Sequence, residues 1–153
     1  MAEKFSCMAA SVASGTNKTV INLFNPAATP TNRGRISDLL ASSHATPADQ
    51  SCQFIVGRST AVGTEGAGYV PNNLDPGGPA GAYDSGNAHS AEPTYTSVKD
   101  LLNFSLNQRA LFRWVSNPGY ELLMAATQNN GLGLYSRAST STQNHDATIL
   151  FEE

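Results

Sequence analysis

Apolar and polar residues alternate along several short stretches of this chain, with the period of two that is typical of a half-buried β-strand. The clearest stretch is Leu102–Asn107, and after a polar break Ala110–Val115 follows, rich in β-forming residues. Asn117–Gly119 then predicts a type II turn, because its proline fixes the second position and its glycine accepts the positive φ of the third. Tyr120–Ala125 is expected to be the returning strand. We expect these three strands to pair as a meander, which a second layer must cover.

Similar signals predict strands along the rest of the chain. The expected strands are Lys4–Val12, Lys18–Phe24, Arg33–Leu40, Ser51–Ser59, Thr94–Leu106, Leu132–Arg137 and Asp146–Glu152, with polar loops at Ala27–Asn32 and Ser139–Asn144. One helical turn at Ser37–Ala41 is an alternative to part of the third strand. Eight or nine short strands and no helix of ordinary length predict a single all-β domain over residues 1–153. A two-sheet β-sandwich of jelly-roll type is our first interpretation, and a closed barrel is the alternative.

The segment from about residue 60 to 93 lacks sustained periodicity. It contains seven glycines and four prolines, and its four acidic residues have no lysine or arginine among them. Loops longer than about 15 residues inside a compact domain are usually functional or disordered. We expect a long arm that reaches onto a neighbouring molecule and orders there. A calcium site is a weaker alternative, because the acidic residues lack the spacing of a known calcium loop.

Composition limits the possible partners. Net charge is −3 and charged residues make up 14% of the chain, against a typical value of about 25%. The nine basic residues are scattered, so the stripe that binds nucleic acid is absent from the sequence and we expect no nucleic-acid partner. No apolar run approaches the length of a membrane span, and no secretion signal is recognisable at the N-terminus, so we expect no membrane partner either.

The residues that could carry chemistry are few. His44, His89 and His145 lie in polar stretches without zinc spacing, and we expect them to be solvated loop residues. Cys7 and Cys52 lie in strand-like contexts, and we expect two buried free thiols, with a bridge between them as the alternative. No glycine-flanked nucleophile motif occurs. We therefore expect no catalytic residue, no metal, no cofactor and no enzymatic activity; a small hydrolase is a distant alternative.

Aromatic residues on the predicted strands allow two interpretations. Trp114 with Phe112, Tyr120 and Tyr135 would form the platform of a sugar-binding module if the rings were exposed. Aromatic residues that alternate along strands are more often part of a core, which is our first interpretation.

Several segments together resemble a known group of proteins. They are Thr46–Asp49, Ala91–Thr96, Leu106–Ala110, Arg113–Val115, Pro118–Leu122 and Ile149–Glu153. These segments resemble virion structural proteins of tailed bacteriophages, above all the capsid decoration or cement proteins. The resemblance implies a β-sandwich, often trimeric, on the outer surface of the virion capsid. There it would bind across subunits of the major capsid protein, after synthesis in the host cytoplasm and without a cofactor.

The contacts with a capsid are expected among residues that should be exposed. The candidates are Arg33, Arg35, Tyr69, Asn72, Asp75 and Tyr83. The alternative function is a carbohydrate-binding or receptor-binding β-sandwich module of a phage tail or fibre.

Overall fold

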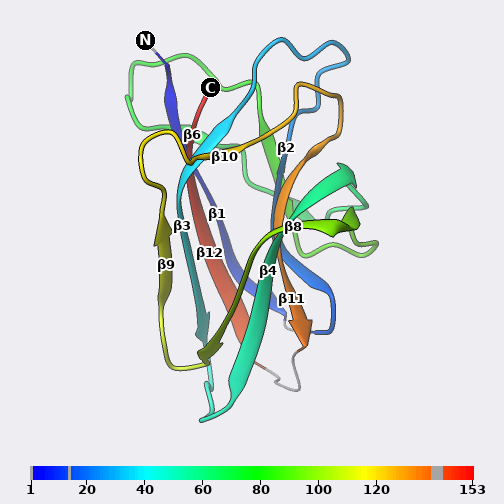
Figure 1. Cartoon of the computed structure of the whole chain (residues 1–153), viewed down its shortest axis with the longest axis vertical. Helices are drawn as coiled ribbons and strands as arrows, with labels where there is room; N and C mark the ends of the chain where they lie inside the picture. The colour runs from blue at the N-terminus through cyan, green and yellow to red at the C-terminus, as the bar shows by residue number, and fades with distance from the viewer. Residues whose placement is uncertain (1, 14, 139–142) are drawn as a thin grey trace.

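The computed structural model describes residues 2–13, 15–138 and 143–153, and this part of the chain is all-β. The strands are β1 (Lys4–Ala13), β2 (Lys18–Phe24), β3 (Arg35–His44), β4 (Ser51–Ala61), β5 (Ala67–Gly68), β6 (Asn72–Asn73), β7 (Asp84–Asn87), β8 (Thr94–Asn107), β9 (Phe112–Val115), β10 (Leu122–Leu123), β11 (Gly131–Ala138) and β12 (Asn144–Glu152). They form two antiparallel sheets packed against each other (Figure 1), so the predicted β-sandwich is confirmed. Of the polar loop expected at Ser139–Asn144, residues 139–142 lie outside the described residues.

Each sheet contains strands from both halves of the chain. Sheet A has the order β10-β3-β12-β1-β6, with β9 also paired to β3, and sheet B has the order β5-β7-β2-β11-β4-β8. Eight of these strands pair in a nested way: β1 with β12, β2 with β11, β3 with β9 and β4 with β8. The first and last strands are therefore neighbours. The amide of Glu3 donates to the carbonyl of Glu153 (3.2 Å), and that of Glu153 donates back to Glu3 (3.1 Å).

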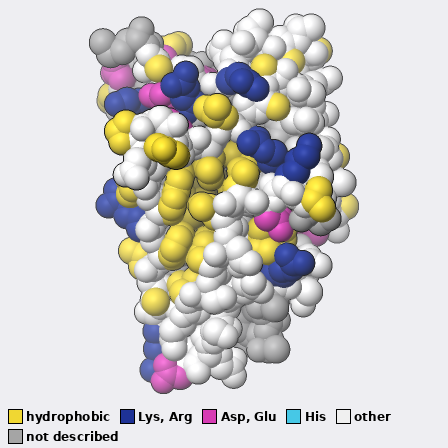
Figure 2. Space-filling model, viewed as in Figure 1, with side chains coloured by type: hydrophobic (Ala, Val, Ile, Leu, Met, Phe, Trp, Pro, Cys, Tyr) yellow, Lys and Arg dark blue, Asp and Glu magenta, His cyan; other side chains and the backbone are white. Residues whose placement is uncertain are grey.

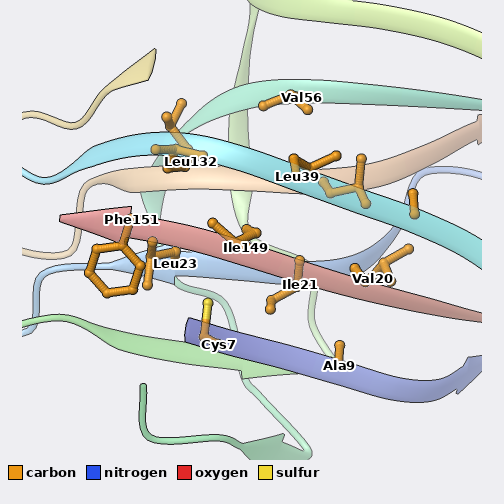
Figure 3. Packing of buried hydrophobic residues seen from close by; sticks show 14 of the residues in the cluster. Cys7, Ala9, Val20, Ile21, Leu23, Leu39, Val56, Leu132, Ile149 and Phe151 are labelled. Atoms are coloured by element: carbon orange, nitrogen blue, oxygen red, sulfur yellow. The ribbon is translucent and has the colours of Figure 1, made fainter. Parts of the chain in front are cut away.

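The core lies between the two sheets, and the alternation of the sequence explains it. In β12 every second side chain from His145 to Phe151 is buried, while those between are partly exposed. Side chains of β1 and β12, among them Cys7 and Ile149, pack against Ile21 and Leu23 of β2 (Figure 3). Burying such aliphatic side chains stabilises the fold by roughly 1.5–3 kcal/mol each.

The predicted meander is wrong, although its strands exist. β8 pairs with β4 in sheet B, whereas β9 and β10 pair with β3 in sheet A, so the chain crosses from one sheet to the other at residues 108–111. β10 is only two residues long. The turn was predicted correctly: Gly119 has a φ of 86°, and the amide of Tyr120 donates to Asn117 O at 2.9 Å. Strand partners are chosen by tertiary packing, which local alternation does not report.

The glycine-rich segment at residues 60–93 is held on the sandwich and does not form a free arm. It contains β5, β6 and β7, which pair with β7, β1 and β2 respectively. Tyr83 is buried, and its hydroxyl accepts from Gly34 N (2.7 Å) and donates to Asn32 O (3.2 Å). Backbone and hydroxyl hydrogen bonds hold this segment, and they need no apolar periodicity.

Candidate interaction surface

Along one side of the sandwich, which we call the opening, strands of sheet B face β9 and β10 of sheet A, and apolar side chains lie between them. Figure 2 shows hydrophobic side chains running along the long axis of the molecule, between the strands of the two sheets. Seven partly buried hydrophobic residues pack against the core here; we call them the apolar strip. They are Leu101, Leu102, Phe104 and Leu106 of β8, Phe112 and Trp114 of β9, and Leu122 of β10. Contiguous exposed apolar surface on a soluble protein marks a binding surface more often than isolated apolar residues do.

Contacts from one sheet to the other hold the strip in shape. The rings of Phe104 and Phe112 stack across the opening, with centroids 3.6 Å apart and planes inclined by 11°. Farther along the opening, Arg58 of β4 donates from Nη1 to the carbonyl oxygen of Leu123 in β10 at 2.7 Å. The opening is therefore bridged by one aromatic pair and one charged hydrogen bond, and its geometry is preformed.

A second cluster lies on the outer face of sheet B and is polar. Tyr95 and Tyr135 stack with their centroids 4.3 Å apart, and the hydroxyl of Tyr135 donates to Asp100 Oδ1 at 3.1 Å. The hydroxyls of Tyr95 and Thr19 lie 3.0 Å apart. Burial raises the pKa of both tyrosines, and the nearby Asp100 carboxylate raises that of Tyr135 further. Both phenols are therefore neutral hydrogen-bonding groups at physiological pH.

Glu92 anchors one side of this polar cluster. Its carboxylate pairs with Lys18 Nζ at 2.7 Å and accepts from the amide of Thr19 at 2.8 Å. Burial opposes ionisation of Glu92, but the hydrogen bonds from Lys18 and Thr19 outweigh it, and its pKa is lowered. A surface pocket of about 430 Å³ adjoins the cluster, lined in part by Glu92, Tyr95 and Arg137. The described polar groups of the cluster mostly bond to one another, so its main role is to hold residues 92–95 on sheet B.

The prediction that the three histidines are solvated loop residues is wrong in part for each of them. His89 and His145 are each only 1% exposed, so the expectation of solvated loop residues is wrong for both. His145 lies in β12, where Nδ1 is 2.9 Å from Ser43 Oγ and the ring meets Phe54 edge-on. Neither ring nitrogen of His89 has a hydrogen-bond partner among the described residues. His44 is partly exposed, but it is the last residue of β3 and not a loop residue, and it pairs with Asp146 at 2.7 Å.

Both cysteines are buried free thiols, as predicted. Cys7 lies in β1 of sheet A and Cys52 lies in β4 of sheet B, and the bridge considered as an alternative is not formed. Burial raises the pKa of Cys7 to about 12 and also raises that of Cys52. Neither thiol is suited to nucleophilic chemistry in the folded protein.

The expected contact residues do not form one site. Tyr83 is buried, so its expected exposure is wrong, whereas the others are exposed. Arg35 lies near the Glu152 carboxylate at 4.0 Å, in the end of sheet A that also carries Asn72 in β6 and the nearby Asp75. Tyr69 lies apart, beside β7, where its amide donates to Ser85 O at 3.2 Å.

The aromatic platform considered from the sequence is also dispersed. Tyr135 is buried under Tyr95 in sheet B, Trp114 is partly buried in the apolar strip of sheet A, and Tyr120 is exposed in the turn before β10. The apolar strip was visible in the sequence as the alternation of Leu102–Asn107. Its partial exposure was not, because that depends on which strands form the edges of the sheets.

Among the described residues, no group of three or more His, Cys, Asp or Glu side chains is placed to hold a metal ion. The described part of the chain also contains no helix long and apolar enough to cross a membrane. Comparison with protein-family models, curated proteins and solved structures gives no match to this chain.

Proposed function

We propose that this chain is a phage capsid decoration protein, a virion structural protein without enzymatic activity that binds across subunits of the major capsid protein. Its place would be the outer surface of the virion capsid. Two things support the proposal: the sequence segments that resemble cement proteins, and a rigid β-sandwich with a preformed apolar surface. The apolar strip carries the argument, because a monomer gains nothing in solubility by leaving seven large hydrophobic residues partly exposed.

The strand pairing supports a sandwich of jelly-roll type. The nested order, first strand with last and second with second-last, is the result of folding one long hairpin over on itself, as two Greek keys require. Segment 60–93 then becomes the connection between the two innermost strands, β4 and β8. The proposal includes a trimer, because the resemblance to capsid decoration proteins implies one.

The alternative, a carbohydrate-binding or receptor-binding module of a phage tail or fibre, is our second proposal. Such a module usually presents an aromatic ring face to its ligand. The buried Tyr135 and the partly buried Trp114 offer less ring surface than that function needs, so we place it second.

The test is co-sedimentation of the purified full chain with undecorated particles of the phage that encodes it, followed by a count of bound copies per particle. Hundreds of copies, in a fixed ratio to the major capsid protein, are expected. Leu122→Asp in the apolar strip should weaken binding at least tenfold, whereas Leu111→Asp should not, because Leu111 is already 64% exposed outside the strip. A handful of copies would favour the tail or fibre proposal, and no binding would overturn both.

A further inference from the structure

We infer that the partner is held by β-strand addition at the free edge of β8, along Leu101–Asn107. The added strand would be an extended segment with apolar residues at alternate positions and an acidic residue near each end. This inference rests on the proposed function, since it specifies how the partner segment is bound, and it applies equally to any protein partner that has such a segment.

The first argument is that the other edges of the sandwich are short or interrupted. Sheet A ends in β6, of two residues, on one side and in β9 and β10, of four and two residues, on the other. Sheet B ends in β5, of two residues, and in β8, of fourteen. The outer edge of β8 has no paired strand among the described residues. β8 is therefore the longest edge strand of the described chain. The outer side of β1 is also unpaired beyond Ser6, but β1 is interrupted there by a bulge between Ala9 and Val12.

The second argument is the direction of its backbone groups. The amide of Gln108 donates to Gln50 O at 3.0 Å, and Leu106 and Phe104 continue this register opposite Cys52 and Phe54. In an antiparallel pair the residues that bond to the partner alternate with residues that do not. The N–H and C=O groups of the intervening residues, Asn103 and Ser105, therefore point away from β4, toward solvent.

The third argument is that this edge lacks the features that normally block pairing. Native edge strands are protected by charged side chains, prolines or bulges. Leu101–Asn107 contains no charged residue and no proline, and its bulges with β4 all lie before Leu102. By contrast, the β9–β10 edge carries Arg113 and is interrupted by the turn at Pro118. A strand added to β8 would also place alternate side chains over the apolar strip.

The charges that flank the edge specify the partner. Lys99 and Arg109 lie five residues on either side of Phe104, and both are exposed. Pairing with a second copy about a two-fold axis at Phe104 would set Lys99 opposite Arg109 of that copy, which is repulsive. An acidic end would instead pair with Lys99, and a second acidic end would share Arg109 with the exposed Asp49 carboxylate, which lies 3.8 Å from it. A different molecule with acidic residues therefore fits this edge better than a second copy of the chain.

The experiment uses a nine-residue synthetic peptide of alternating valine and threonine with an aspartate at each end. Binding to the full chain is followed through Trp114, the only tryptophan, which lies in the apolar strip, and through hydrogen exchange of the β8 amides. We expect saturable binding and slower exchange at Asn103 and Ser105. A peptide with lysine at each end should bind at least tenfold more weakly. No binding of the aspartate peptide at 1 mM, or equal binding of the two peptides, would overturn the inference.

Ser105→Pro is the sharpest variant, because it removes an outward-facing N–H and leaves the bonds to β4 intact. It should lose at least tenfold in peptide affinity, while the control Ser105→Ala stays within twofold. Unchanged affinity of a folded Ser105→Pro protein would refute the inference. Should that variant unfold, Lys99→Glu is the deciding variant. It should lower the affinity for the aspartate peptide and raise the affinity for the lysine peptide. No change in either affinity would refute the inference.

The capsid experiment separates the two proposals. If the unaltered chain decorates particles and Ser105→Pro does so equally well, the edge inference fails and the proposed function stands. If the chain binds the peptide in the expected way but no particle, the proposed function fails and the edge inference stands. Dimerisation of the unaltered chain that Ser105→Pro abolishes would overturn the choice of partner in favour of a second copy.

Discussion

The aromatic ring of Tyr95 lies on the backbone of Gly133. A Cβ atom at position 133 would be 2.8 Å from Tyr95 Cε1 and closer still to its hydroxyl oxygen. Tyr95 cannot move aside without losing its stack on Tyr135 and its hydrogen bond to Thr19. The missing side chain at position 133 is therefore what allows residues 92–95 to close over sheet B.

Gly133→Ala should destabilise the protein by about 1–3 kcal/mol, the usual cost of overpacking a well-packed site. Chemical denaturation monitored by circular dichroism measures this loss. Gly77→Ala is the matched control, because its Cβ would meet only Asp75 Oδ1, at 3.6 Å, and the free energy of unfolding should hardly change. Equal stability of both variants would mean that the Tyr95 ring can move away from position 133 at no cost in free energy.

Stability should fall as the pH drops below about 6.5, the ordinary pKa of histidine. Burial lowers the pKa of His89 and His145, so the unfolded chain takes up protons that the folded chain does not. The stability that the two neutral histidines contribute is fully present above about pH 6.5. As the pH falls below that value, the free energy of unfolding drops by at most about 1.4 kcal/mol per pH unit for each ring. Burial raises the pKa of Glu65, which opposes the trend mainly at more acidic pH.

Denaturant unfolding at a series of pH values between 7 and 5 tests the histidine effect. His89→Gln should flatten the pH dependence, because it removes one of the two buried rings. His44→Gln should leave most of it, since His89 and His145 are both retained. A pH dependence that survives in a His89→Gln, His145→Gln double variant would assign the effect to carboxylates.

Neither cysteine should react in the folded state. Cys7 and Cys52 are 2% and 1% exposed, and burial raises both pKa values. A thiol reagent at pH 8 should label no cysteine within minutes in native buffer and two per chain in denaturant without reductant. Two titratable thiols are expected because the two cysteines lie in different sheets and are not bridged. Finding no thiol in denaturant would show a disulfide and contradict the structure.

The stack of Phe104 on Phe112 should couple the two sheets energetically. Each single change to alanine removes a partly buried ring, and the double variant should lose less than the sum of the two. Aromatic pairs typically show a coupling of about 0.5–1.5 kcal/mol. A double-mutant cycle measured by urea unfolding gives this value, with Phe104 and the exposed Leu111 as a control pair whose coupling should be near zero.

The strands that the sequence predicts well are those whose signal is local. Lys18–Phe24 is reproduced at both ends, and the strands near Ser51 and Asp146 differ only in their bounds. Alternation and β-branched residues report the exposure of a strand on its two faces, and the sandwich depends mainly on that property. The type II turn at Asn117–Gly119 is local in the same sense.

The errors concern properties that depend on residues distant in sequence. Segment 60–93 has no apolar pattern, yet backbone pairing and the buried Tyr83 hold it on the sandwich. His145 was expected in a loop because it follows polar residues, but it is the first buried position of β12. The apolar strip was predicted as part of a covered meander. It became a candidate interaction surface only when β8 and β9 were found in different sheets.

The position of β12 between β1 and β3 has a consequence for the order in which the chain can fold. Sheet A has no central strand until Asn144–Glu152 docks, so β1 and β3 cannot be joined before a segment that lies about a hundred residues or more along the chain from each of them. Such non-local topologies fold slowly, in roughly milliseconds to seconds, because the entropy of closing long loops is lost before the native contacts form. During synthesis, the edges of β1 and β3 that face β12 stay unpaired until Asn144–Glu152 has left the ribosome. Acquisition of the native sandwich is therefore expected to be a late and cooperative event.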